Sequence, residues 1–99
     1  MKRFRLSLKA VEDLTDAFNY LEKQSPRAAR AVIDKLFAAM DRIGRTPSLG
    51  HMREDLTDRP VKFYSVYSYL IVYDPAPRPI RILHVIYGKR DVAEILRSD

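Results

Sequence analysis

The chain has 99 residues, 46% of them hydrophobic and 31% charged, and its formal net charge at pH 7 is +5. This length and composition fit one folded domain over residues 1–99, and the absence of cysteine excludes disulfide scaffolds, thiolate zinc sites and cysteine nucleophiles. No apolar run approaches the ~18 residues of a membrane span, so we expect a cytoplasmic protein that does not contact a membrane.

Residues 3–7 alternate polar and apolar side chains, which predicts a short strand. Ser7 is a suitable N-cap for a helix over residues 8–23. The apolar residues of this helix recur at steps of three and four and form one stripe: Ala10, Val11, Leu14, Ala17, Phe18 and Leu21. Acidic residues occupy the other side of its first half, where the helix dipole favours them.

A second helix begins after a short turn. Ser25 is placed as its N-cap and Pro26 as its first residue, which is the pairing that favours helix starts. Its apolar band is wider than that of the first helix, so we expect it to be covered on more than one side. Gly44 and the Thr-Pro pair after it are predicted to end the helix. The short connection predicts an antiparallel helical hairpin.

Residues 46–60 are rich in proline, glycine and polar side chains and are predicted to form a loop. Three runs rich in β-branched and aromatic residues follow at 61–66, 69–73 and 80–87, and each predicts a strand. Tyr64, Tyr67, Tyr69 and Tyr73 crowd these strands and are expected to pack across them with their hydroxyls at a wet edge. The short links between the strands favour antiparallel pairing.

Alternation assigns the side chains of the last strand to two faces. One face would carry Ile80, Ile82, His84 and Ile86, and the other Arg81, Leu83, Val85 and Tyr87. Residues 91–96 are predicted to form a short closing helix capped by Asp91. The complete order predicts an α+β domain with an N-terminal strand, a helical hairpin on a small antiparallel sheet and a short C-terminal helix.

This layout and its local motifs resemble the ParE branch of the RelE/ParE superfamily of bacterial toxins. The matching motifs are Leu6-Ser7…Ala10…Asp13-Leu14, Ser25-Pro26-Arg27-Ala28-Ala29, Pro47…Gly50, Tyr69-Leu70-Ile71-Val72-Tyr73, and Ile80-Arg81-Ile82-Leu83-His84-Val85 running into Gly88-Lys89-Arg90-Asp91…Ile95-Leu96. They span nearly the whole chain, and their order and spacing carry the resemblance.

The resemblance implies the toxin of a type II toxin–antitoxin module. Its partner would be a ParD-like antitoxin of the ribbon-helix-helix type, bound in a hetero-oligomer, and its target would be DNA gyrase, as described for ParE proteins. The RelE branch instead cleaves messenger RNA on the ribosome, and this activity is the alternative function. A binding module that kept the fold and lost toxicity is a third interpretation.

The sequence lacks residues that nuclease chemistry requires. Cleavage through the 2′-hydroxyl needs a general acid, a general base and cations for the developing charge. Arg90 matches the late arginine of the RelE-like nucleases, but Leu96 stands where they carry a C-terminal tyrosine and Leu70 where they carry an arginine. Lys62 lies near a lysine-bearing strand in an uncertain register. We therefore expect no enzyme and no cofactor.

Two other residues could replace the missing acid and base. His84 and Tyr87 are the candidates, but on a strand their spacing places them on opposite faces. His84 is better explained as a histidine within an apolar face. His51 lies in the loop, and two histidines in different elements do not predict a metal site.

Two surfaces remain as candidate binding sites. Tyr20 falls outside the apolar stripe of the first helix and Phe37 lies at the edge of the second helix's band, so we expect the antitoxin to bind there. Lys89, Arg90 and Arg97 form a basic tip near the C-terminus, which by analogy with ParE proteins would contact gyrase or its DNA.

Overall fold

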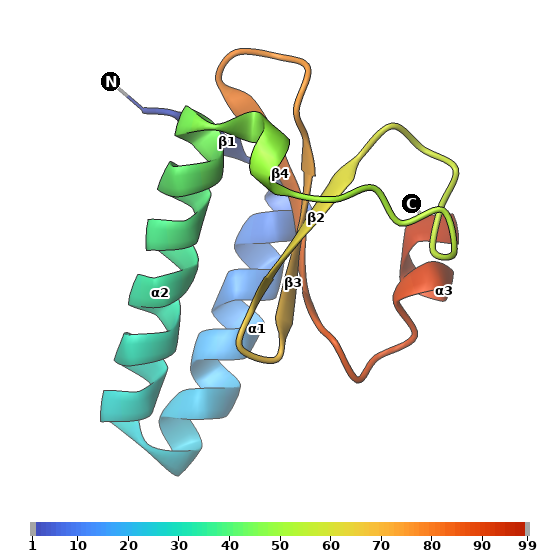
Figure 1. Cartoon of the computed structure of the whole chain (residues 1–99). Coiled ribbons are helices and arrows are strands. Elements are labelled where there is room, and N and C mark those ends of the chain that lie inside the picture. Colours follow the sequence, from blue (N-terminus) through green and yellow to red (C-terminus); the bar gives the residue numbers. More distant parts are fainter. Residues whose placement is uncertain (1, 99) are drawn as a thin grey trace.

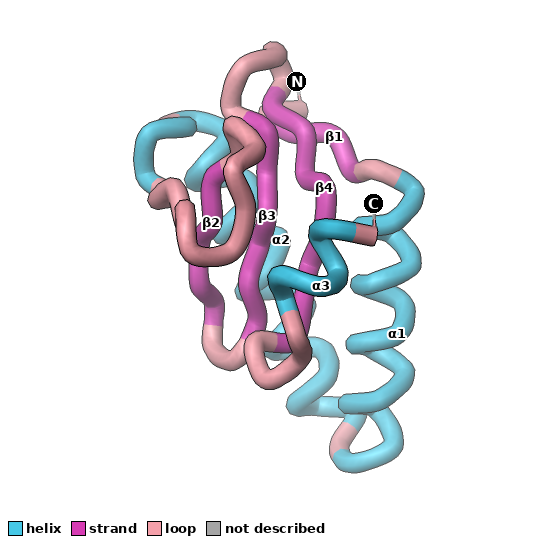
Figure 2. Tube along the Cα trace, turned by 90° about the vertical axis from the view of Figure 1, so that its right-hand side faces the viewer, coloured by secondary structure: helices cyan, strands magenta, loops and turns pink. Residues whose placement is uncertain are grey.

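The computed structural model describes residues 2–98 and has three layers. The elements are β1 (Phe4–Leu6), α1 (Leu8–Gln24), α2 (Pro26–Arg45), a single 3-10 turn η1 (Pro47–Leu49), β2 (Lys62–Val66), β3 (Tyr69–Asp74), β4 (Ile80–Tyr87) and α3 (Val92–Arg97). Helices α1 and α2 form an antiparallel hairpin on one face of the sheet (Figure 1). Helix α3 and part of the loop before β2 lie over the other face (Figure 2). The expected α+β architecture is confirmed.

The sheet has the strand order β1-β4-β3-β2. Strands β2, β3 and β4 pair antiparallel, as their short links predict. Strand β1 pairs parallel to β4, so the complete sheet is mixed rather than wholly antiparallel. The helical hairpin between β1 and β2 supplies the long connection that a parallel neighbour requires.

Each face of the sheet has its own apolar core. The larger core lies under the helical hairpin and contains Ala10, Leu14, Ala17, Leu36, Ala39, Met40, Ile43, Tyr69, Ile71, Tyr73, Ile80, Ile82 and Val85. The smaller core lies under α3 and contains Val61, Phe63, Val72, Ile86, Val92 and Leu96, with Leu56, Leu70, Leu83 and Ile95 packed against it. The wide band of α2 is thus covered by α1 and the sheet together.

The predicted faces of β4 are wrong from His84 onward, because the strand carries one extra residue. Val72 of β3 pairs with His84 and Tyr73 pairs with Ile82, so Leu83 has no partner on β3. A bulge of this kind shifts the alternation by one position. Ile80 and Ile82 therefore lie in the larger core, whereas Ile86 lies in the smaller core, and Val85 changes to the helical side.

The free edge of β4 is completed by side chains from the start of α1. Strand β1 reaches only as far as Ile82 of β4. Beyond it, the Ser7 hydroxyl donates to the carbonyl of Leu83 at 2.9 Å and also accepts the Ala10 N–H at 3.0 Å, which caps α1. The Asp13 carboxylate then accepts the Val85 N–H at 2.9 Å. These bonds satisfy backbone groups that would otherwise be left unpaired at the edge.

Helix α2 ends at Arg45 with Thr46 as its C-cap, so the end predicted from Gly44 and the Thr-Pro pair is confirmed, although Gly44 itself is still helical. A Cβ at this glycine would lie 2.7 Å from both the Cβ and the carbonyl oxygen of Arg3. Gly44 therefore serves close packing of α2 against the segment before β1, a role for which its missing side chain is required.

The loop that follows α2 is anchored by a tyrosine. The hydroxyl of Tyr73 donates to the carbonyl of Pro47 at 2.6 Å and accepts the N–H of Gly50 at 2.9 Å. Tyr73 is fully buried, so the expectation that its hydroxyl lies at a solvent-exposed edge is wrong. His51 then forms an isolated bridge with Phe63 of β2, which brings the loop alongside the sheet.

We expect Asp13→Ala to lower the free energy of unfolding at pH 7 by about 1–3 kcal/mol, because it leaves a buried backbone donor unsatisfied. Burial opposes the charge of this carboxylate, but nearby His84, the Val85 N–H and Lys9 outweigh it, so the pKa of Asp13 lies below its usual 3.8. A carboxylate whose pKa is lower in the folded than in the unfolded chain stabilises the fold at any pH above its unfolded pKa. This stabilisation is lost as the pH falls through the folded pKa.

Urea unfolding measured between pH 7 and pH 2 tests this prediction. The wild-type chain should lose more stability on acidification than Asp13→Ala does. Asp34→Ala, which removes an exposed carboxylate from α2, is the control and should follow the wild type. Equal acid losses in wild type and Asp13→Ala would contradict the assignment.

Candidate functional site

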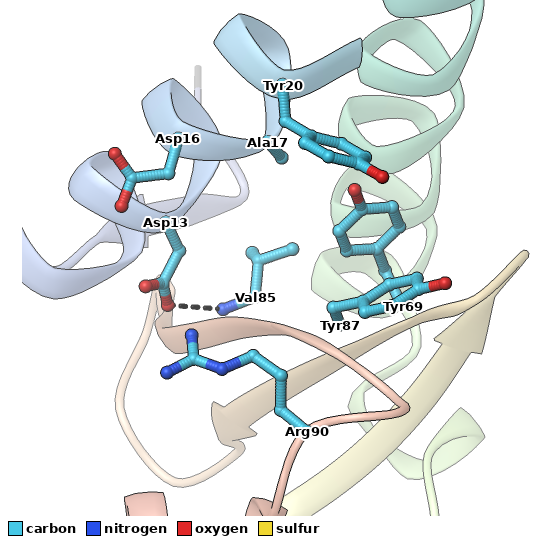
Figure 3. A pocket seen from close by; sticks show the side chains of 8 residues that line it. All are labelled: Asp13, Asp16, Ala17, Tyr20, Tyr69, Val85, Tyr87 and Arg90. Atoms are coloured by element: carbon cyan, nitrogen blue, oxygen red, sulfur yellow. Dashed lines mark hydrogen bonds between the residues drawn. The ribbon is translucent and has the colours of Figure 1, made fainter.

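A pocket of about 410 Å³ lies between α1, the ends of β3 and β4, and the turn that leads to α3 (Figure 3). Its lining residues are Asp13, Asp16, Ala17, Tyr20, Tyr69, Val85, Tyr87 and Arg90. Three tyrosine rings gather on one side of this α1 pocket, and the charged side chains stand on the other (Figure 3). The pocket therefore has an aromatic wall and a charged wall.

The aromatic wall is built from three different elements. Tyr69 of β3 pairs with Tyr87 of β4, and their ring centroids are 5.6 Å apart at an interplanar angle of 57°. Tyr20 approaches from α1 and is 64% exposed, whereas Tyr87 is 38% and Tyr69 9% exposed. Burial, with Tyr87 and Tyr20 nearby, raises the pKa of Tyr69, so its hydroxyl stays protonated at neutral pH. The wall offers open ring surface and the neutral hydroxyl group of Tyr69.

The carboxylate of Asp13, on the charged wall, is already engaged. It accepts the Val85 N–H, and its other oxygen lies 3.6 Å from the Nζ of Lys9. Asp16 extends from the next turn of α1, with its carboxylate directed away from the tyrosines (Figure 3).

Arg90 is the exposed cation of the charged wall. The two acids that could have paired with it along the chain have other roles, because Asp91 caps α3 and Glu94 pairs with Arg97. Within residues 2–98, the guanidinium of Arg90 forms no ion pair. It is therefore available for a bound anion.

The predicted basic tip is divided in the structure. Lys89 and Arg90 lie together in the exposed turn between β4 and α3. Arg97 lies at the end of α3, pairs with Glu94 and lines a different hollow, which it shares with acidic residues of the loop before β2. The structure thus brings two of the three predicted target-binding residues together and separates the third from the α1 pocket.

The predicted antitoxin-binding residues are also separated. Tyr20 lines the α1 pocket, whereas Phe37 packs against Phe4 of β1 with 6.2 Å between ring centroids and keeps 37% of its surface exposed. Tyr20 consequently shares its pocket with Arg90, a residue assigned from sequence to the other surface.

The residues of the alternative nuclease site do not converge. Lys62 of β2 pairs with Tyr73 of β3, which in turn pairs with Ile82 of β4. Tyr87 lies five residues after Ile82, so Lys62 and Tyr87 are separated by about 17 Å along the strand direction. His84 is 1% exposed and pairs with Val72 of the smaller core, while Tyr87 pairs with Tyr69 in the α1 pocket. The expectation that His84 and Tyr87 lie on opposite faces is confirmed.

The two leucines that replace nuclease residues meet in the smaller core. Leu96 is 3% exposed there, and Leu70 packs against the same cluster. Neither can transfer a proton or stabilise a developing negative charge. Apolar side chains that pack in the smaller core thus occupy the two positions, 70 and 96, where RelE-like nucleases carry polar residues.

Sequence reasoning missed most of the α1 pocket. The acidic residues of α1, Asp13 and Asp16 among them, are predicted only to lie opposite its apolar stripe, and Tyr69 only to pack across the strands. The spacing of Asp13, Asp16 and Tyr20 places all three on one side of α1, and this signal could have indicated a shared surface. The residues of β4 could not have been added, because the bulge at Leu83 is not visible in the sequence.

Residues 2–98 offer no set of three or more His, Asp or Glu side chains arranged to hold a metal ion. Over the same residues, none of the helices has the length and apolar character needed to cross a membrane.

Comparisons with known proteins give two findings. The family model described as "ParE toxin of type II toxin-antitoxin system, parDE" matches residues 4–92. A solved chain titled "Chromosomal ParDE TA system from P. aeruginosa" superposes with a TM-score of 0.71 at 16% identity, covering 87% of this chain and 95% of that one. A search of curated proteins gave no match.

We expect Leu96→Ala to lower the free energy of unfolding by about 2–4 kcal/mol, because it opens a cavity in the smaller core. Arg97→Ala, one position later, should change it by only about 0–1 kcal/mol, since its ion pair with Glu94 is exposed. Urea unfolding of both variants measures the difference. Similar small losses would show that α3 does not depend on this core.

Proposed function

The chain belongs to the ParE family of toxins of type II toxin–antitoxin systems, and from this premise we propose that it acts by binding DNA gyrase and is held inactive by a ParD-like antitoxin. The family match over residues 4–92 is the observation that carries the proposal. A protein with these partners works in the cytoplasm.

Action by binding rather than catalysis is supported by the smaller core. Leu70 and Leu96 fill it with apolar side chains where RelE-like nucleases carry an arginine and a tyrosine. The remaining candidates do not form one constellation: Lys62 lies on β2, His84 is buried with its Nδ1 3.8 Å from Asp13, and Tyr87 lines the α1 pocket. A phosphoryl-transfer site needs its groups held in one geometry, and this arrangement lacks that condition.

The proposed contact with gyrase is the turn between β4 and α3. Lys89 and Arg90 are exposed there, and Arg90 is free of any ion pair within residues 2–98. The net charge of +5 favours an acidic partner surface or the DNA that gyrase holds. Arg97 contributes less to this contact, because it is paired and faces another hollow.

The proposed contact with the antitoxin is the helical hairpin. Tyr20 and Phe37 leave ring surface uncovered on α1 and α2, and such surface is typical of a site for a partner segment that folds as it binds. The two residues lie apart, so one antitoxin chain would have to extend across the hairpin to reach both.

A supercoiling assay with the purified chain and DNA gyrase tests the target. We expect the chain to inhibit supercoiling and Arg90→Gln to raise the inhibitory concentration about tenfold or more, because one charge-assisted contact is lost. Arg45→Gln removes another exposed arginine, which pairs with Asp41 at the far end of α2, and is the matched control. Ribosome-dependent cleavage of messenger RNA without inhibition of supercoiling would instead support the nuclease.

Calorimetric titration with the antitoxin encoded beside the chain tests the second contact. Tyr20→Asp and Phe37→Asp should each weaken binding about tenfold or more, because a charge replaces buried aromatic surface. Tyr67→Asp, which alters an exposed tyrosine in the β2–β3 turn, is the control. Unchanged affinity in correctly folded variants would contradict the assignment.

A further inference from the structure

We propose that the α1 pocket receives an aromatic side chain with a neighbouring carboxylate, supplied by the antitoxin, and that this contact covers Arg90. The identity of the partner rests on the proposed function. The chemistry of the ligand rests on the pocket alone.

The aromatic part of the ligand follows from the three tyrosines. Tyr20 and Tyr87 keep 64% and 38% of their surfaces exposed, and the buried ring of Tyr69 lies between them (Figure 3). Rings prefer offset or tilted neighbours, and Tyr69 and Tyr87 are already tilted at 57° to each other. A further ring placed against them buries apolar area on both partners.

The carboxylate part follows from the charges that remain unsatisfied. The carboxylate of Asp13 is compensated by the N–H of Val85 and by Lys9, so it does not need an incoming cation. Arg90 stands beside it with no ion pair among residues 2–98, and a guanidinium binds a carboxylate through two parallel hydrogen bonds. Asp16 is directed away from the tyrosines, and the guanidinium of Arg90 lies beside Asp13 on the charged side of the pocket (Figure 3).

The shape of the surface favours a chain segment over a small molecule. A second, smaller hollow of about 260 Å³ adjoins the α1 pocket and shares Asp13 and Arg90 with it. It leads along Lys9 and Ile86 to Ile95 of α3. A peptide can therefore place one ring among the tyrosines, a carboxylate on Arg90 and its next residues along α3.

The proposal has a direct consequence for neutralisation. Tyr20 and Arg90 lie in one pocket, so a segment bound at Tyr20 also covers the arginine that we assign to target binding. The antitoxin and the target would then exclude each other by occupying the same place, and no change of fold is required.

NMR titration of the isotope-labelled chain with N-acetyl-L-tryptophan tests the ligand chemistry. The chain contains no tryptophan, so the indole signals belong to the probe alone. N-acetyl-L-tryptophanamide has the same ring without the carboxylate and is the matched probe. We expect the acid to bind at least threefold more tightly than the amide, with shifts at Tyr20, Tyr69, Tyr87 and Arg90.

Variants separate the two parts of the pocket. Arg90→Gln should abolish the difference between acid and amide, whereas Tyr87→Ala should weaken both probes at least threefold. Tyr67→Ala and Arg45→Gln remove an exposed tyrosine and an exposed arginine outside the pocket and should change neither affinity. Spectra of the free variants show whether each is folded.

Three results would overturn the proposal. The acid and the amide bind wild type equally, the preference for the acid survives in Arg90→Gln, or the shifted signals lie outside the pocket. A fourth concerns the partner: an antitoxin that shifts signals around Phe37 and Phe4 but none in the α1 pocket does not occupy it. Gyrase is absent from these experiments, so their failure differs from failure of the supercoiling assay.

Discussion

The molecule depends on how the outer edge of β4 is completed. Strand β1 covers this eight-residue strand only from Ile80 to Ile82, and an edge left bare beyond that point would expose unpaired backbone groups. Ser7 and Asp13 of the following segment supply the missing partners from their side chains. Because both residues also belong to the start of α1, the same bonds hold the helix beside β4 and thereby hold Tyr20 over the tyrosines of the sheet.

The parts of the fold that the sequence predicted are those with local signals. Ser7, Ser25 with Pro26, and Asp91 mark helix starts through hydrogen bonds made within one turn, and each caps the helix expected of it. Gly44 correctly marked the end of α2, but its contact with Arg3 is tertiary and does not show in the sequence. A glycine that permits close packing against Arg3 has the same appearance in a sequence as one that ends a helix.

The candidate site was predicted only in fragments. Tyr20 and Arg90 were identified, but they were assigned to different surfaces, and only the tertiary fold brings residues so distant in the sequence into one pocket. Comparison with the RelE-like nucleases identified Leu70 and Leu96 as replacements for an arginine and a tyrosine, but it did not indicate where the two leucines pack. Their packing into a second core depends on where α3 lies in the fold, and the sequence does not show which face of the sheet α3 covers.

The extra residue at Leu83 also affects how this chain is compared with its relatives. Before it, even-numbered residues of β4 face the helical hairpin, and after it odd-numbered residues do. An alignment that passes through this point without a gap, against a relative whose strand is regular, would match Tyr87 to a side chain on the opposite face. The role of a residue in one such protein can be assigned to the other only after their strands are superposed in space. Conservation scored from the columns of an ungapped alignment would mix residues from the two faces of the sheet.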